Sequence, residues 1–175
     1  MSVDPSALAR AIRVVPDFPQ AGIQFQDITP LLGDPALLAQ AVSLLAAPFS
    51  EAGITKVVAI ESRGFILGAA LAHRLGAGFV PMRKSGKLPY ETQAASYDLE
   101  YGTDTIEMHQ DALQSTDRVL IHDDVIATGG TAAAAAQLVQ DNAQLFGFAF
   151  LLEIKALQGR GRLDQDTPVH SVLTV

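Results

Sequence analysis

Short apolar runs rich in valine and isoleucine alternate with helical segments along most of this 175-residue chain. Four such runs occupy residues 56–61, 78–82, 118–122 and 146–154. Segments with helical spacing lie between them, at 64–75 and 132–141. Runs of this composition are typical of strands buried on both faces of a sheet. The strand–helix–strand order therefore predicts an α/β fold with a central, mostly parallel sheet flanked by helices.

The N-terminal region is predicted to differ from this pattern. Asp4 and Pro5 are typical of a helix start, so we expect an amphipathic helix over 4–15. An irregular segment is expected over 20–32, and a second helix over 34–50.

Between the second and third apolar runs the chain is more polar. Residues 83–95 include Gly86 and Pro89 and are predicted to form a long mobile loop. Two extended runs follow over 96–108, and the turn residues between them predict a hairpin. A last apolar run covers 169–175.

Composition restricts what such a chain can do. With 49% hydrophobic residues it can bury a core, and its length suits one domain. The absence of cysteine excludes disulfides, a thiol nucleophile and cysteine-based metal sites. The N-terminus lacks a signal-peptide pattern, and no apolar stretch approaches the roughly 20 residues of a membrane span. We therefore expect a cytoplasmic protein.

Charge is unevenly distributed along the chain. The formal net charge of −7 argues against nucleic acid or an anionic membrane as a partner. Residues 62–90, however, contain none of the 19 acidic residues. They contain five of the 12 basic residues, namely Arg63, Arg74, Arg83, Lys84 and Lys87. A cationic segment in an acidic chain indicates a small, highly anionic ligand.

The chemically most informative segment is 119–131, with the sequence VLIHDDVIATGGT. Its apolar start predicts a strand, and its glycines and threonines predict a turn that opens a helix. Such a turn directs several backbone N–H groups toward one point, which suits a phosphate monoester. Asp123 and Asp124 lie just upstream, where carboxylates would accept hydrogen bonds from vicinal sugar hydroxyls. The C-terminal ends of parallel strands are the expected place for such a ligand.

Each part of this segment also has a simpler interpretation. Asp-Asp alone is more often a solvated turn, and glycines often serve only a tight bend. The complete string favours a ligand site, because every part has a matching role. No lysine follows the glycines as in a Walker loop, and the dinucleotide pattern Gly-x-Gly-x-x-Gly is absent from the segment.

Segment 119–131 resembles the signature by which type I phosphoribosyltransferases bind phosphoribosyl diphosphate (PRPP). Further blocks cover nearly the whole chain, in the order in which the adenine phosphoribosyltransferase family has them. They are Phe18-Pro19, 22–30 (GIQFQDITP), 57–68 with Glu61-Ser62-Arg63-Gly64-Phe65, 83–89 (RKSGKLP) and 97–102 (YDLEYG). The chain is thereby identified as similar to that family.

The resemblance implies a purine-salvage transferase that forms AMP and pyrophosphate from adenine and PRPP. Mg²⁺ would be held mainly by PRPP, pyrophosphate and water. The type I phosphoribosyltransferase fold would cover 1–175 as a single domain. Residues 1–33 would form an N-terminal helix and a base-binding hood, and 34–175 a core with a lid at about 83–108. A homodimer is also implied, in which Arg83 can reach across the interface.

The resemblance further implies the residues of the PRPP site. Asp123 and Asp124 would contact the ribose hydroxyls. The 5′-phosphate would be bound by Ala127, Thr128, Gly129, Gly130 and Thr131. Pyrophosphate would be bound by Glu61, Ser62, Arg63, Arg83, Lys84 and Lys87. In the family the peptide corresponding to Glu61–Ser62 is typically cis, and residues 88–96 would close over PRPP to exclude water.

Base binding and catalysis are assigned in the same way. Phe25 would stack on adenine, while the backbone of Gln24 and Gln26 would read its edge. The catalytic residues implied are Glu100, Arg63 and Tyr101. Glu100 would manage the proton at N7 of adenine as pyrophosphate leaves, and Tyr101 would pack beside the reacting sugar.

Three positions depart from the family's pattern. Gln26 replaces a common arginine, and Gln24 replaces an apolar residue, which would make the base pocket wetter. His122 stands at a strand position that is usually valine or isoleucine. A lone histidine in a strand is more often a core residue than a catalyst, so it is assigned no role.

Two alternatives remain. One is a phosphoribosyltransferase for another base, such as hypoxanthine, xanthine or orotate, for which the two glutamines leave room. The other is a non-catalytic regulator that retains the fold and senses PRPP. Retention of Glu100 and of the basic residues at 83–87, without an appended basic DNA-binding domain, favours the enzyme.

Overall fold

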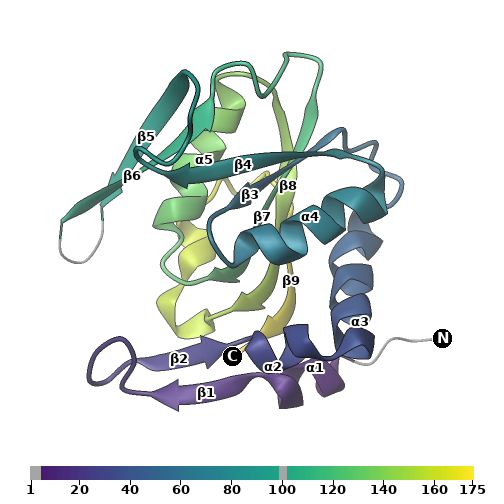
Figure 1. Cartoon of the computed structure of the whole chain (residues 1–175), viewed down its shortest axis with the longest axis vertical. Helices are drawn as coiled ribbons and strands as arrows, with labels where there is room; N and C mark the ends of the chain where they lie inside the picture. The colour runs from purple at the N-terminus through teal and green to yellow at the C-terminus, as the bar shows by residue number, and fades with distance from the viewer. Residues whose placement is uncertain (1–4, 99–101) are drawn as a thin grey trace.

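A seven-stranded sheet with the order β5-β6-β4-β3-β7-β8-β9 is the main element of the computed structural model, which describes residues 5–98 and 102–175 (Figure 1). The strands are β3 (Lys56–Ile60), β4 (Gly78–Lys84), β5 (Thr92–Asp98), β6 (Thr103–His109), β7 (Arg118–Ile126), β8 (Gln144–Glu153) and β9 (Val169–Thr174). The five strands from β4 to β9 in this order are parallel, whereas β6 and β5 add antiparallel pairs at one edge. The predicted α/β fold is therefore confirmed.

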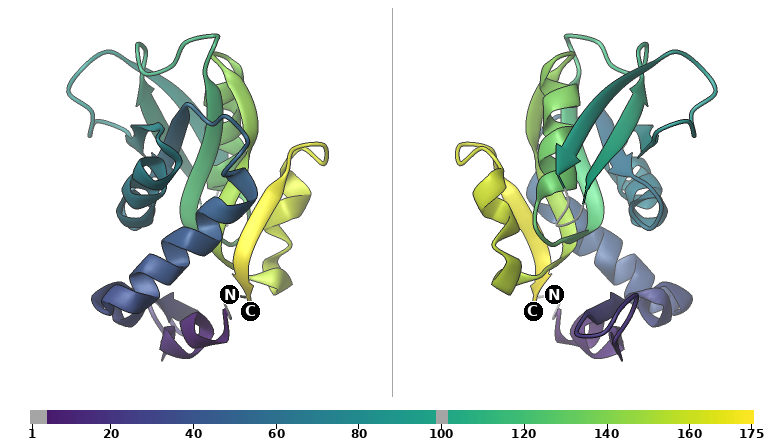
Figure 2. Two further views of the ribbon diagram at one scale, coloured as in Figure 1. Left: turned by 90° about the vertical axis from the view of Figure 1, so that its right-hand side faces the viewer. Right: turned by 90° about the vertical axis from the view of Figure 1, so that its left-hand side faces the viewer.

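Helices cover both faces of this sheet (Figure 2). One face is covered by α5 (Gly130–Gln140), whose Leu138 belongs to the same buried cluster as Val58. The other is covered by α3 (Pro35–Ala46), its 3-10 extension η1 (Ala47–Phe49) and α4 (Gly64–Leu75). There Leu67 belongs to the same cluster as Val57. Val57 and Val58 are neighbours in β3 and so point to opposite faces, which explains why the strand is apolar throughout.

The N-terminal region differs from the sequence prediction. The helix predicted over 4–15 is too long, because α1 spans only Ser6–Ala11 and β1 follows at Arg13–Pro16. β-branched residues directly before a proline disfavour continuation of a helix. Segment 20–32 is not irregular either, since it contains β2 (Gln24–Asp27) and α2 (Thr29–Gly33). β1 and β2 form an antiparallel ribbon that lies at one end of the main sheet (Figure 1).

Two strands extend into segments that were predicted to be loops. The loop expected over 83–95 covers only 85–91, because β4 continues to Lys84 and β5 begins at Thr92. Pairing of β5 with β6 along its whole length overrides its polar composition, and the predicted hairpin is confirmed. Likewise, the turn predicted to begin at Asp123 begins later, because β7 runs to Ile126 alongside β8.

After β8 the chain forms two 3-10 turns, η2 (Lys155–Leu157) and η3 (Gly159–Arg162), before it enters β9 at the sheet edge. No helix in the described ranges is long and apolar enough to cross a membrane.

Candidate active site

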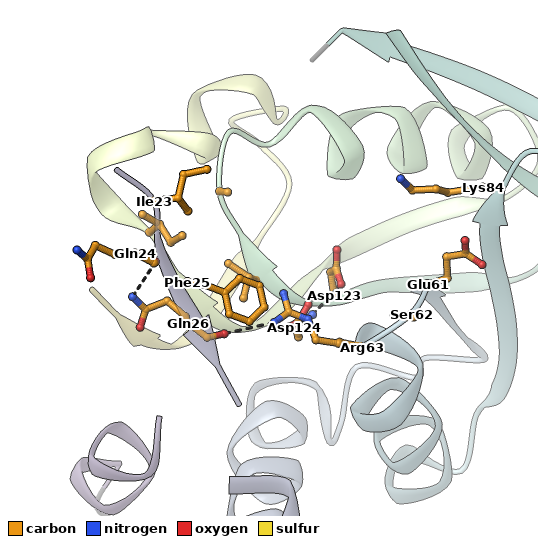
Figure 3. A pocket seen from close by; sticks show the side chains of 13 residues that line it. Ile23, Gln24, Phe25, Gln26, Glu61, Ser62, Arg63, Lys84, Asp123 and Asp124 are labelled. Atoms are coloured by element: carbon orange, nitrogen blue, oxygen red, sulfur yellow. Dashed lines mark hydrogen bonds and ion pairs between the residues drawn. The ribbon is translucent and has the colours of Figure 1, made fainter. Parts of the chain in front are cut away.

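A cavity of about 480 Å³ lies between the β1–β2 ribbon and the ends of β3, β7 and β8 (Figure 3). The predicted site residues that line it are Gln24, Phe25, Gln26, Glu61, Ser62, Arg63, Lys84, Asp123, Asp124 and Ala127. Three residues that were not predicted complete the lining, namely Ile23, Val125 and Ile154. The cavity thus occupies the C-terminal ends of parallel strands, where the sequence places a ligand.

The predicted phosphate loop lines a second, smaller cavity of about 80 Å³. The loop residues there are Ala127, Thr128, Gly129, Gly130 and Thr131, and Asp123 borders both cavities. Gly129 precedes α5 with a φ of 80°, a conformation that favours glycine. The first N–H groups of a helix have no partner within it, so this end of α5 can bind an anion. Asp123 therefore lies between an anion site and a larger cavity.

Arg63 connects the ribbon to the strand ends. Its Nε lies 2.9 Å from Asp124 Oδ2, and its Nη1 donates to the carbonyl of Gln26 at 3.3 Å. Its guanidinium carbon lies 4.7 Å from the centroid of the Phe25 ring, a cation–π contact. Figure 3 shows Phe25, Arg63 and Asp124 gathered at the centre of the cavity. Arg63 thus covers the ring face on which an aromatic base would stack.

Asp123 and Asp124 lie near the end of β7 with little access to solvent. Asp124 is 4% exposed, and Asp123 Oδ1 accepts from the Asp124 N–H at 2.8 Å. Burial raises the pKa of both carboxyls. The neighbouring Asp124 charge raises the pKa of Asp123 further, whereas Arg63 opposes the rise at Asp124. Carboxylates in this setting gain from additional hydrogen-bond donors, such as two sugar hydroxyls.

Gly64 allows α4 to begin directly against this pair. A Cβ at position 64 would lie 2.8 Å from Asp123 Oδ1 and 3.2 Å from Asp123 Cα. Only glycine leaves that space free. The positive end of the α4 dipole consequently lies beside a carboxylate, which it stabilises.

The residues predicted for pyrophosphate lie at the ends of β3 and β4. The Glu61–Ser62 peptide bond is cis, as the resemblance implies. Arg83 Nε donates to Glu61 Oε2 at 2.5 Å, and Arg83 Nη1 donates to the Lys87 carbonyl at 3.1 Å. Lys84, at the end of β4, lines the cavity. Arg83 and Lys87 are not among the lining residues within the described part of the chain.

The β5–β6 hairpin contributes two residues that sequence reasoning missed. Asp104 Oδ2 lies 2.9 Å from Lys84 Nζ and accepts from the Tyr97 hydroxyl at 3.4 Å. The Tyr97 ring also packs against the phosphate loop, since a Cβ at Gly130 would lie 3.3 Å from Tyr97 Cδ2. The hairpin therefore links Lys84 to the phosphate loop. Tyr97 and Asp104 face each other across the hairpin, and a sequence pattern alone does not fix that register. The predicted catalytic residues Glu100 and Tyr101 lie outside the described residues.

Of the three apolar lining residues that were missed, Ile154 could have been predicted, because it is the last residue of the apolar run 146–154. It directly follows Glu153, which pairs with Ile126 at the end of β7. The C-terminal ends of neighbouring parallel strands lie at the same edge of the sheet, so Ile154 is expected at the same ligand-binding edge as Asp124. Ile23 and Val125 are adjacent to predicted residues but carry no polar group that would single them out.

The carboxylates of the site do not form a metal-binding cluster by themselves. Among residues 5–98 and 102–175, no group of three or more acidic or histidine side chains could hold a metal ion. Asp124 is paired with Arg63, and Glu61 with Arg83. Mg²⁺ is commonly bound by one or two carboxylates together with substrate phosphates and water. The donor set therefore fits an ion that a phosphate ligand brings with it.

His122 is a core residue, as the sequence interpretation has it. Its side chain is completely buried, with Nδ1 2.8 Å from the Ala149 carbonyl oxygen. Nε2 has no hydrogen-bond partner within the described residues. Burial lowers the pKa of His122 to about 4, so the ring is neutral at physiological pH.

Comparison with known proteins agrees with this site. The phosphoribosyl transferase domain matches residues 32–174. The adenine phosphoribosyltransferase of Acidothermus cellulolyticus is 55% identical over 96% of this chain and 95% of that protein. The crystal structure of the Rhodothermus marinus adenine phosphoribosyltransferase has a TM-score of 0.94 and 64% identity, covering 97% of each chain. The Saccharomyces cerevisiae enzyme, complexed with an imino-altritol bisphosphate and adenine, has a TM-score of 0.90 and 42% identity, covering 96% of this chain and 97% of that chain.

Proposed function

Because the chain belongs to the adenine phosphoribosyltransferase family, we infer that it is an enzyme of purine salvage. It transfers the 5-phosphoribosyl group from PRPP to adenine and yields AMP and pyrophosphate. One observation carries this assignment, namely the order of groups along the site. An aromatic and apolar cavity, a carboxylate pair and a glycine-rich helix N-terminus follow one another. Base, ribose and 5′-phosphate follow one another in AMP in the same order.

The base would occupy the larger cavity, with Phe25 on the ribbon side and Ile154 on the sheet side. Two backbone carbonyls of β2 are already hydrogen-bonded there. The Gln24 carbonyl accepts from Gln26 Nε2 at 3.4 Å, and the Gln26 carbonyl accepts from Arg63. An exocyclic amine can replace either donor, whereas an oxo group cannot donate to a carbonyl. This chemistry favours adenine over hypoxanthine.

Transfer breaks the bond between C1′ of PRPP and the pyrophosphate oxygen as N9 of adenine attacks C1′. Negative charge accumulates on pyrophosphate while the ribose gains oxocarbenium character. Arg63, Arg83 and Lys84 would offset the charge on the leaving group, and Asp123 and Asp124 would hold the ribose hydroxyls. The N–H groups of the phosphate loop would fix the 5′-phosphate and so orient the sugar.

Mg²⁺ is the metal that phosphoribosyltransferases generally use with PRPP. When bound, it would neutralise part of the diphosphate charge and make pyrophosphate a better leaving group. We propose that the substrate and water supply most of its ligands. Of the cavity residues, Glu61, Asp123 and Asp124 have the carboxylate chemistry to assist.

The catalytic assignment of Glu100 rests on the resemblance and is tested by Glu100→Gln. We expect kcat for AMP formation to fall by about 100-fold or more, because the amide cannot exchange a proton with N7. The Kd of PRPP, measured by calorimetry, should change by less than about twofold. Glu51→Gln, an exposed position in the turn after η1, serves as the control. Equal losses in kcat and PRPP affinity would make Glu100 structural. An unsubstituted chain that binds PRPP but makes no AMP would be the non-catalytic regulator.

We further propose a homodimer. Ile66 in α4 is 49% exposed and Phe79 near the start of β4 is 37% exposed, so both leave apolar surface accessible to solvent. Such surface suits a subunit interface. Sedimentation velocity should give one species of twice the chain mass, and a monomer would contradict the proposal. The cytoplasmic location and the division into hood and core stay predictions from the sequence.

A further inference from the structure

A second segment of the chain packs directly against the 5′-phosphate loop. A Cβ at Gly129 would overlap the carbonyl oxygen of Gly159, and a Cβ at Gly159 would overlap the carbonyl oxygen of Ala127. The same Cβ at Gly159 would also lie 3.0 Å from the Gly129 nitrogen. The backbones of 127–129 and of Gly159 are therefore in contact with no side chain between them, and a shift in one must move the other.

The approach to this contact is strained. Gln158, directly before η3, has φ 51° and ψ 34°, the left-handed conformation that residues other than glycine rarely adopt. This conformation costs about 1 kcal/mol or more and persists only where surrounding contacts hold it. The strained residue lies next to the glycine that contacts the phosphate loop. Contacts with residues outside η3 must therefore hold this turn in place.

Arg160 supplies the contacts that hold the turn. Its Nε donates to the Glu153 oxygens at 2.9 and 2.8 Å, and its Nη2 donates to Glu153 Oε2 at 2.6 Å. Nη1 donates to the Val169 carbonyl at 2.9 Å, and Nη2 to Ser171 Oγ at 3.1 Å. Glu153 ends β8, and the other two residues belong to β9. The planar guanidinium thus ties η3 to two strands at once, which a lysine cannot reproduce.

We propose that Gly159 and Arg160 are positioning residues for the 5′-phosphate of PRPP. Arg160 fixes η3 on the sheet, and Gly159 fixes the backbone of 127–129, so that the N–H groups of the loop converge on the phosphate. This inference rests on the proposed function, because it takes that loop as the 5′-phosphate site. The pyrophosphate residues lie at the ends of β3 and β4. A displaced η3 should therefore weaken ligands that carry a 5′-phosphate and spare pyrophosphate.

Gly159→Ala tests the proposal against Gly161→Ala, a matched control in the same turn where a Cβ meets nothing within 4 Å. Ribose 5-phosphate and pyrophosphate are titrated separately into each full-length protein by calorimetry, and KM is measured for PRPP and adenine. Gly159→Ala should raise the Kd of ribose 5-phosphate and the KM of PRPP about tenfold or more. The Kd of pyrophosphate should change by less than about twofold. In Gly161→Ala, both Kd values and both KM values should change by less than about twofold.

Arg160→Lys and Arg160→Ala form a second series that keeps the test open if Gly159→Ala fails to fold. Affinity for ribose 5-phosphate should fall in both, and lysine should retain more of it than alanine. Equal losses for pyrophosphate and ribose 5-phosphate would overturn the proposal, and so would a lower unfolding temperature with an unchanged Kd for ribose 5-phosphate. If the unsubstituted chain makes no AMP, the proposed function fails, while the binding of ribose 5-phosphate still decides this inference.

Discussion

Three cations at the PRPP site are bound by carboxylates of the chain itself. The partners of Arg63, Arg83 and Lys84 are Asp124, Glu61 and Asp104, in that order. The pairs of Arg83 and Lys84 are partly exposed and contribute about 0–1 kcal/mol each, so a polyanionic substrate can displace them. We therefore propose that PRPP binding is an exchange at each of these two cations, in which a phosphate oxygen replaces a carboxylate oxygen.

Asp104→Asn tests this exchange at Lys84. The Asp104 carboxylate raises the pKa of Lys84 and competes with pyrophosphate for it. Without that charge, affinity for pyrophosphate and PRPP should rise by about two- to fivefold, a small effect because both side chains are partly exposed. Calorimetry measures the change, and Asp111→Asn at an exposed site serves as the control. Weaker pyrophosphate binding in Asp104→Asn would show that Asp104 orients Lys84 toward the ligand.

His122 should make the fold sensitive to acid. Its pKa is about 4 in the folded chain and about 6.5 when unfolded, so the unfolded chain binds the extra proton between these values. The free energy of unfolding therefore falls as pH drops from 6.5 toward 4, by about 2 kcal/mol at pH 5. His122→Val should remove this part of the decline. Urea unfolding at pH 7 and pH 5 measures it, and identical pH dependence in the two proteins would contradict the assignment.

Residue chemistry made part of this site predictable. Asp123, Asp124 and the glycines at 129–130 could be predicted because their types and spacing match a ribose phosphate. Asp104 and Tyr97 could not, because their role arises from the register of a hairpin. Gly159 and Arg160 could not either, because no pattern in the sequence brings η3 against the phosphate loop.

At the scale of elements, β7 shows why strand ends are hard to predict. Its apolar run stops at Ile121, yet the strand continues through both aspartates to Ile126. Parallel pairing with β8 satisfies its backbone there. The extension determines where the carboxylates lie, since residues in a strand alternate between faces. Asp123 and Asp124 both line the larger cavity at this strand end, and Asp123 also borders the cavity at the start of α5.

The packing of α4 against the sheet depends on a second glycine, Gly68. A Cβ at Gly68 would lie 2.5 Å from Ala59 Cβ in β3 and 3.3 Å from His122 Cδ2. Gly68→Ala should therefore lower the free energy of unfolding by about 1–3 kcal/mol, even though alanine favours the helix. Gly33→Ala, where a Cβ meets nothing within 4 Å, is the control. Denaturant unfolding of both variants checks this, and equal stability would mean that α4 shifts without cost.

Across the whole molecule, the parallel core and the presence of the β5–β6 hairpin were predictable, whereas the β1–β2 ribbon and the full extent of the hairpin were not. Strands buried on both faces carry continuous apolar runs, which the sequence displays directly. The β1–β2 ribbon and the β5–β6 hairpin are more exposed, and their pairing with distant segments determines their structure. These additions carry Phe25, Tyr97 and Asp104, so the less predictable parts of the fold also carry residues of the proposed site.

Charge is also organised across the whole molecule. The net charge of −7 is an average over an acidic chain and the cationic segment 62–90. That segment begins just after β3, with Arg63 directly before α4, and contains the end of β4 with Arg83 and Lys84. Asp123 and Asp124 lie between these cations and the phosphate loop. In the proposed site, the sign of the charge thus follows the parts of PRPP, with cations for the diphosphate and carboxylates for the sugar.

The measurement that tests the central claim most directly is turnover with a panel of nucleobases. The purified full-length chain is given PRPP, Mg²⁺ and either adenine, hypoxanthine, xanthine, guanine or orotate, and each nucleotide product is quantified by chromatography. We predict AMP from adenine, with stoichiometric pyrophosphate, at a kcat/KM at least about 100-fold above that for any other base. A higher kcat/KM for hypoxanthine, xanthine or orotate, or no nucleotide from any base, would contradict the account.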